Sequence, residues 1–182
     1  AASARDTEYR FLSEMQKEKM KDSILNMDFI SVRDDATKRL INSLSSFDSI
    51  IKIPDPTFAL EVDNSYAQNY FDKKGIKQTE KLICIHLTRQ FSWGKEFTQI
   101  ARKHGYKVVS LRPCYYADYV FNDLSPLEYS GIFKFFSGVI THRFHDTVFS
   151  LKNLTPVITA IPNATYSNQH GESKYSCILK DF

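Results

Sequence analysis

VITHRFHDTVFSLKNLTPVITAI, residues 139–161, predicts a strand, a helix and a second strand. The run begins with three β-branched residues and ends with a buried-type strand over 156–161. Between them, apolar residues recur at helical spacing: Phe144, Val148, Leu151 and Leu154. A strand–helix–strand unit of this kind belongs to a parallel sheet, in which ligands bind at the carboxyl ends of the strands.

The segment between the first strand and the helix carries residues suited to an anion. The first amide N–H groups of a helix have no partner within it and favour a negatively charged ligand. Arg143 offers a planar guanidinium for phosphate or carboxylate, and His145 titrates near neutral pH. An ordinary structural interpretation stays open, in which Arg143 is solvated and His145 makes a helix-cap contact.

Composition restricts the class of protein. The chain has 182 residues, of which 42% are hydrophobic and 14% aromatic, which suits one domain or one domain with an appendage and excludes a disordered polymer. The net charge is only +3, from 24 basic and 21 acidic residues. A charge so close to neutral gives no nucleic-acid footprint, so any functional positive potential must be local.

The lack of a secretory signal in the first residues and the spacing of the cysteines both favour a cytoplasmic location. The three cysteines are widely spaced and predict neither a disulfide framework nor a metal site, and Cys84 lies in an apolar run typical of a core. The first residues lack the apolar segment of a secretory signal, and no run approaches the ~20 apolar residues of a transmembrane helix. We therefore expect a reduced, cytoplasmic chain without a transmembrane segment.

Strands alternating with helices predict an α/β fold with a mainly parallel, Rossmann-like sheet and helices on both faces. We expect one sheet of six strands, near 29–33, 50–54, 81–87, 107–111, 139–142 and 156–161. The helices are expected at 8–27, 35–44, 64–73, 91–104 and 125–138, with a loop at 113–124. No strand is followed by a G-x-G-x-x-G or a P-loop motif, so these two nucleotide fingerprints are absent.

Arginines end four of the predicted strands: Arg33, Arg89, Arg112 and Arg143. Each alone fits a solvated strand end. Since strand ends share one edge of a parallel sheet, together they predict a crevice for a small ligand with several negative charges, and we expect two or three of them to line it.

The remaining polar residues are weaker candidates. His142 flanks the same strand end, His86 fits a satisfied core histidine, and His104 fits a helix end before a glycine. Carboxylates near the predicted crevice are candidates for a base: Asp55, Asp118, Asp123 and Asp146.

Three stretches resemble the polysaccharide pyruvyl transferase family. They are ISVRDDATKRLI (30–41), IIKIPDPTFAL (50–60) and the region 125–161, which is centred on Arg143-Phe144-His145 where the family has Arg-Leu-His. The likeness spans most of residues 29–182. Phenylalanine replaces the usual leucine of the motif.

The resemblance implies a two-lobed, glycosyltransferase-B-like fold. Residues 29–182 would be its Rossmann-like C-terminal domain, and residues 1–28 the last strand and connecting helix of an otherwise missing N-terminal lobe. The implied reaction transfers pyruvate from phosphoenolpyruvate, as a ketal, onto a sugar of an exopolysaccharide or cell-surface polysaccharide precursor. No further cofactor is implied.

Carried over by motif position, Arg33, Arg143 and His145 would bind the donor, with Arg89 and Arg112 as further substrate-binding candidates. Arg143 and His145 would be the catalytic pair, since a histidine suits a general acid or a phosphate partner. The acceptor would be a sugar or a lipid-linked oligosaccharide.

Two alternatives remain. A nucleotide-sugar glycosyltransferase lobe would share the architecture, but it often places glycines and a glutamate after the corresponding strand, and residues 143–146 supply neither. A non-catalytic module that binds an anion or packs against a partner is the other.

Overall fold

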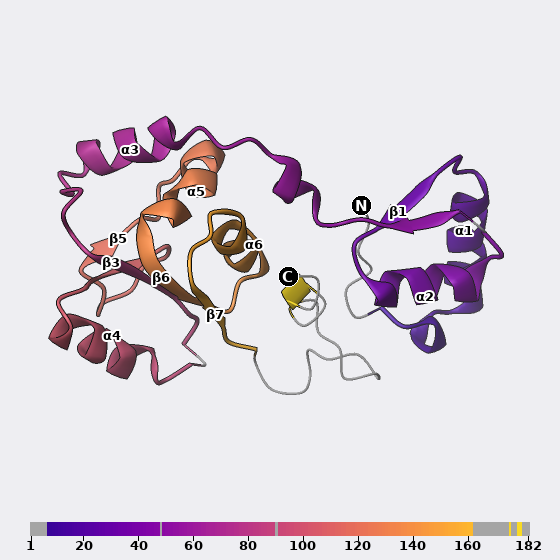
Figure 1. The fold of residues 1–182 in the computed structure, drawn as a ribbon. Coiled ribbons are helices and arrows are strands. Elements are labelled where there is room, and N and C mark those ends of the chain that lie inside the picture. Colours follow the sequence, from indigo (N-terminus) through magenta and orange to yellow (C-terminus); the bar gives the residue numbers. More distant parts are fainter. Residues whose placement is uncertain (1–6, 48, 90, 162–174, 176–177, 180–182) are drawn as a thin grey trace. The chain divides into compact units, whose positions relative to one another are not determined.

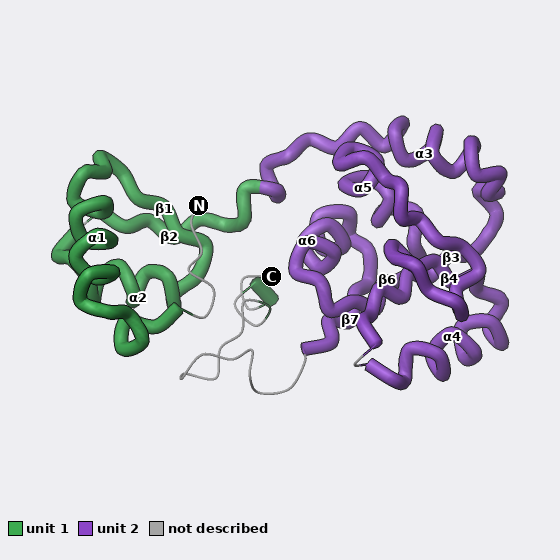
Figure 2. The backbone as a smooth tube through the Cα atoms, turned by 180° about the vertical axis from the view of Figure 1, so that it is seen from behind, with its two compact units in different colours: residues 1–56, 162–182 green, residues 57–161 purple. Residues whose placement is uncertain are grey.

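The computed structural model describes residues 7–47, 49–89, 91–161, 175 and 178–179, and it divides into two compact units (Figure 2). Unit 1 comprises residues 1–56 and 162–182, and unit 2 comprises residues 57–161. This division differs from the boundary expected after residue 28. The strand end predicted in residues 1–5 lies outside the described residues, so its assignment to a preceding lobe stays a prediction.

Unit 1 is a small α/β unit around two parallel strands (Figure 1). Its elements are η1 (Tyr9–Phe11), α1 (Glu14–Leu25), β1 (Ile30–Val32), α2 (Asp35–Leu44) and β2 (Ile50–Lys52). The side chain of Asp34 caps α2 by accepting the Thr37 N–H at 2.7 Å. A separate core holds the unit together and consists of Ile24, Ile30, Val32, Leu40, Ile41, Leu44 and Ile50.

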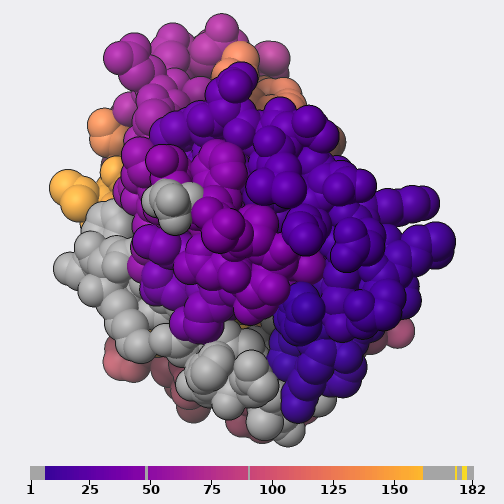
Figure 3. Space-filling model, turned by 90° about the vertical axis from the view of Figure 1, so that its right-hand side faces the viewer, coloured from indigo at the N-terminus to yellow at the C-terminus, as the bar shows by residue number. Residues whose placement is uncertain are grey.

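Helix α1 begins later and buries less than its sequence pattern predicts. Ser13 forms a capping box with Gln16, so the helix starts at Glu14 rather than near residue 8. Of the apolar residues at helical spacing in 8–27, Ile24 is buried, but Phe11 and Met15 are 72% and 66% exposed. Figure 3 shows the surface of residues 7–56 in indigo to purple.

Unit 2 is built on five parallel strands in the order β5-β4-β3-β6-β7 (Figure 1). The strands are β3 (Leu82–His86), β4 (Lys107–Ser110), β5 (Tyr119–Val120), β6 (Phe136–Thr141) and β7 (Val157–Thr159). The register pairs His86 with Thr141 and Thr141 with Thr159, so three strands end level with one another.

The expectation of one six-stranded sheet is wrong, because β1 and β2 form a separate sheet, in which the described residues place no third strand, and β5 joins the larger sheet. Strand β5 lies in the stretch predicted as loop. The amides of Asp118 and Phe121 donate to the carbonyls of Val108 and Ser110, both at 2.8 Å. Two residues are too few to show strand periodicity, so this pairing has no signal in the sequence.

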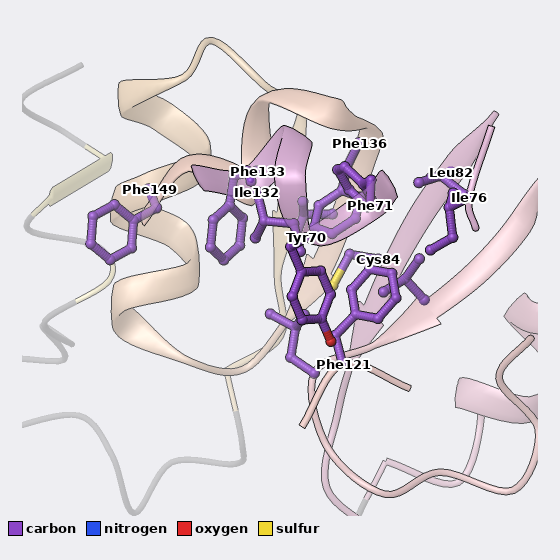
Figure 4. Packing of buried hydrophobic residues seen from close by; sticks show 14 residues of the cluster. Tyr70, Phe71, Ile76, Leu82, Cys84, Phe121, Ile132, Phe133, Phe136 and Phe149 are labelled. Carbon is purple, nitrogen blue, oxygen red and sulfur yellow. The ribbon is translucent and has the colours of Figure 1, made fainter. Parts of the chain in front are cut away.

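Helices cover both faces of the five-stranded sheet, as predicted. They are α3 (Asn64–Lys73), α4 (Gly94–Lys103), α5 (Pro126–Ile132), η3 (Phe133–Phe135) and α6 (Phe144–Lys152), while the short helix η2 (Pro56–Ala59) lies in the connection between the two units and buries no residue. Alternate residues of β3 face opposite sides, with Cys84 in the cluster of α3, α5 and α6, and Ile85 against α4. Figure 4 shows the aromatic rings of the first cluster gathered with Leu82 and Cys84.

Local signals set most helix ends. Gly75 and Gly105 follow α3 and α4 with φ of +68° and +80°, a conformation that favours glycine, and His104 caps α4 as predicted. Helix α5 starts at the predicted Ser125-Pro126 but ends at Ile132, not near residue 138, because β6 begins at Phe136.

Candidate functional site

The turn between β6 and α6 lies at the carboxyl edge of the sheet. Strand β6 ends at Thr141, Arg143 is the N-cap residue of α6, and its side chain makes no cap hydrogen bond. The first helical bond joins the Thr147 N–H to the Arg143 carbonyl at 3.2 Å. The earlier amides of the helix, from Phe144 to Asp146, precede this bond, so they form the positive end of the helix dipole.

The side chains of this turn point to two different environments. Arg143 and His145 are exposed, whereas Phe144 and Asp146 are buried. His145 contacts the Phe144 ring at 5.5 Å between centroids. The exposed residues are the two predicted as the catalytic pair, and the structure places them on one turn.

Asp146 is fully buried and accepts three side-chain hydrogen bonds. Its Oδ2 accepts from Nδ1 of His86 at 2.7 Å and from Oγ1 of Thr141 at 2.7 Å, and its Oδ1 accepts from the Tyr129 hydroxyl. We name these four residues the Asp146 network. His86 is therefore a satisfied core histidine, as its position within an apolar strand predicted.

Burial and the charge of Asp146 raise the pKa of Tyr129, so its hydroxyl keeps its proton and donates. Cys84 is fully buried in the neighbouring core, as predicted, and this burial raises the pKa of its thiol. Removing a donor from a buried polar group leaves an acceptor without a partner, which costs about 1–3 kcal/mol. The hydrogen bonds of the Asp146 network therefore fix the start of α6 beneath the exposed side chains of the turn.

His142 links the turn to the neighbouring strand. Its Nδ1–H donates to the backbone carbonyl of His86 at 3.0 Å, and its ring lies 5.6 Å from that of Phe91. Burial, with a smaller effect of the Arg143 charge, lowers the pKa of His142, so the ring is neutral at pH 7.

Three of the four strand-end arginines follow neighbouring strands of one sheet. Arg112 follows β4, Arg89 follows β3 and Arg143 follows β6, so all three lie at the same carboxyl edge. Arg89 and Arg143 are exposed, and Arg112 is half-buried. The structure therefore places three cations at one edge of the sheet, and their binding of an anion stays a prediction.

Arg33 belongs to a different sheet from these three arginines, because it follows β1 of the two-stranded sheet in unit 1. Its guanidinium pairs with the buried carboxylate of Asp55 at 2.5 Å. Its role at the donor site stays a prediction.

The carboxylates considered as bases are all engaged. Asp55 pairs with Arg33, Asp118 with Arg102 at 3.0 Å, and Asp123 with Lys74 at 2.8 Å. The hydrogen bond from Lys74, followed by that from Tyr70, lowers the pKa of Asp123. Asp146 is enclosed in its network. None of the four is placed as a free base.

The opposite end of α6 borders an open hollow of about 560 Å³. Lys152, Leu154 and Asn64 line it, and Lys152 donates to the Phe58 carbonyl at 2.7 Å. The residues that line this hollow include none of the predicted site residues.

Within the described part of the chain, no group of three His, Cys, Asp or Glu side chains is placed to hold a metal ion. Nor is any helix of the described residues long and apolar enough to cross a membrane.

Comparison with known families decides the assignment. The family model described as polysaccharide pyruvyl transferase matches residues 1–164. The chain belongs to the polysaccharide pyruvyl transferase family. Membership agrees with the resemblance carried by Arg143-Phe144-His145.

A solved structure supports the fold of this pyruvyl transferase family member. The wall teichoic acid polymerase TagF, determined after a soak with CDPG, matches with a TM-score of 0.54 at 13% sequence identity. The match covers 98% of this chain and 50% of the TagF chain, so the chain spans about half of that length. At this identity the likeness shows the glycosyltransferase-B-like fold alone. A search of curated protein sequences finds no match.

Proposed function

We propose that this chain carries the phosphoenolpyruvate site of a cytoplasmic pyruvyl transferase acting on an exopolysaccharide or cell-surface polysaccharide precursor. The observation that carries the proposal is the exposed pair Arg143 and His145 at the amino end of α6, in a chain of this family. The acceptor would be a sugar or lipid-linked oligosaccharide.

The chemistry of the donor fits the charges at this edge. Phosphoenolpyruvate carries a carboxylate and a phosphate, and guanidinium groups with a helix amino end suit both. In forming the ketal, two sugar hydroxyl oxygens bond to the central carbon and lose their protons, and the methylene carbon gains one proton. The bond between the central carbon and the phosphate oxygen breaks, and phosphate leaves with the other proton. His145 is exposed at the turn and would deliver that proton or bind the phosphate.

Calorimetry with phosphoenolpyruvate tests the donor assignment. Arg143→Ala should weaken binding tenfold to more than a hundredfold, since a hydrogen bond to a charged group contributes roughly 1.5–3 kcal/mol. Lys103→Ala is the matched control, because this exposed cation lies at the end of α4 that leads into the amino end of β4. Its affinity should equal that of the wild type.

Two results would contradict the proposal. Equal affinity of wild type and Arg143→Ala would remove Arg143 from the site. Tighter binding of a nucleotide sugar than of phosphoenolpyruvate would favour the glycosyltransferase alternative. The fold that this chain has in common with TagF suits that alternative as well.

A further inference from the structure

The backbone of Arg143 is held by hydroxyl groups on both sides. Its N–H donates to Oγ1 of Thr141 at 2.9 Å, and its carbonyl accepts from Oγ1 of Thr147 at 3.2 Å. Thr147 also bonds to Thr159 of β7 at 2.9 Å. An exposed, long side chain thus projects from a peptide that is fixed at its amide and its carbonyl.

Thr141 connects this peptide to the Asp146 network. Its Oγ1 accepts the Arg143 N–H and donates its own proton to Asp146 at 2.7 Å, so one hydroxyl bridges the turn and the buried carboxylate. Thr141 is fully buried, so water does not replace the bond if the hydroxyl is lost. His86 and Tyr129 hold the carboxylate from two other elements, β3 and α5.

We propose that Thr141 is a positioning residue for the anion site, setting the direction of Arg143 and of the first amides of α6 through its hydroxyl. This inference rests on the proposed function, since it assumes that Arg143 binds the phosphoenolpyruvate anion. Preorganised donors bind an anion more tightly than mobile ones, because their ordering is not repeated on binding. A role in stability alone would leave the affinity of the folded protein unchanged.

Two substitutions at Thr141 separate these roles. Thr141→Val keeps the shape and removes the hydroxyl, whereas Thr141→Ser keeps the hydroxyl. Calorimetry with phosphoenolpyruvate on the whole chain, well below the melting temperature of each variant, should show Kd raised about tenfold by valine and within about twofold of wild type for serine.

Thr98→Val is the matched control. Thr98 is equally buried, and its hydroxyl donates to the Gly94 carbonyl at 3.0 Å on α4, on the other face of the sheet. It should lower the melting temperature and leave Kd unchanged. If Thr141→Val does not fold, Tyr129→Phe takes its place, because it removes a donor to Asp146 and keeps the ring. It should raise Kd several-fold.

The outcomes are distinct. If folded Thr141→Val binds phosphoenolpyruvate with wild-type affinity, the inference is overturned and the proposed function stands. The same holds for folded Tyr129→Phe if it has to replace Thr141→Val. Equal loss of affinity in Thr98→Val also overturns it, since general destabilisation would then explain the effect. No binding of phosphoenolpyruvate by the wild type would instead refute the proposed function, and the inference with it.

Discussion

At the scale of single residues, one turn carries both exposed side chains that could contact a ligand and a buried side chain that holds the turn in place. Arg143 and His145 are exposed, while Asp146 beside them is fully buried with three donors. Helix geometry explains the contrast, because consecutive residues of a helix face different directions. The exposed pair is free to meet a ligand, and the buried carboxylate fixes the turn that carries it.

His145→Ala should impair function without loss of stability. His145 is exposed, and substitutions at such positions usually change the free energy of unfolding by less than ~0.5 kcal/mol. In the complete transferase we expect kcat to fall ~10²–10⁴-fold, as for loss of a general acid. His145→Gln should keep part of the donor binding, since its amide still donates a hydrogen bond. Normal turnover with a lowered melting temperature would show that His145 has only a structural role.

At the scale of elements, helix α5 brings Tyr129 to Asp146. It has only seven residues, and its start is set by Pro126 and a capping box. Ser125 Oγ accepts the Glu128 N–H at 3.3 Å, and Glu128 Oε2 accepts the Ser125 N–H at 2.7 Å. Since so short a helix is marginal alone, the cap contributes a large share of its local order.

Ser125→Ala should therefore lower the free energy of unfolding by about 1 kcal/mol, within the 0.5–2 kcal/mol range of lost N-caps. Urea unfolding of the chain measures the effect. Ser125→Thr, which keeps the hydroxyl, should lie close to the wild type. A Ser125→Ala midpoint identical to wild type would mean that packing alone holds α5.

At the scale of the whole molecule, the net charge is near neutral, but several carboxyl groups have pKa values below their ordinary ones. A hydrogen bond from Tyr119 lowers the pKa of Glu80, and hydrogen bonds with Ser125 lower the pKa of Glu128. The pKa of Asp123 is lowered by Lys74. All three carboxylates lie in unit 2.

Acid should consequently destabilise the chain. A carboxyl group whose pKa is lower in the folded state releases its proton more readily there, so the unfolded chain takes up protons first as the pH falls. Its contribution is complete above the ordinary values of 4.5 for Glu and 3.8 for Asp, and it is lost below them, through the lower folded-state values. Urea unfolding at pH 7, 5, 4 and 3 should show stability decreasing below about pH 4.5.

Asp123→Asn is the control for this pH dependence. It removes one titrating group, so the decline between pH 4 and pH 3 should be shallower than in wild type. Stability that is constant or rising between pH 5 and pH 3 would contradict the assignment of these carboxylates.

The sequence alone predicted the elements with local signals. Helices α2 and α3 have the predicted bounds of 35–44 and 64–73, and the apolar run at 81–87 predicted β3. The run at 139–142 predicted only the second half of β6, which begins at Phe136. The motif Arg143-Phe144-His145 indicated the family, and the order of strands and helices predicted a parallel sheet with both faces covered. These features depend on neighbours within a few residues, which is why they can be recognised in the sequence.

Only the tertiary structure decided which distant residues meet. It separated β1 and β2 from the five-stranded sheet, paired Arg33 with Asp55, and joined Asp146 to His86, 60 residues away in the chain. A polar residue in an apolar strand signals a buried partner, but the sequence does not name that partner, because burial depends on how strands pair and helices pack. The same tertiary pairing placed Arg89, Arg112 and Arg143 along one edge of the sheet.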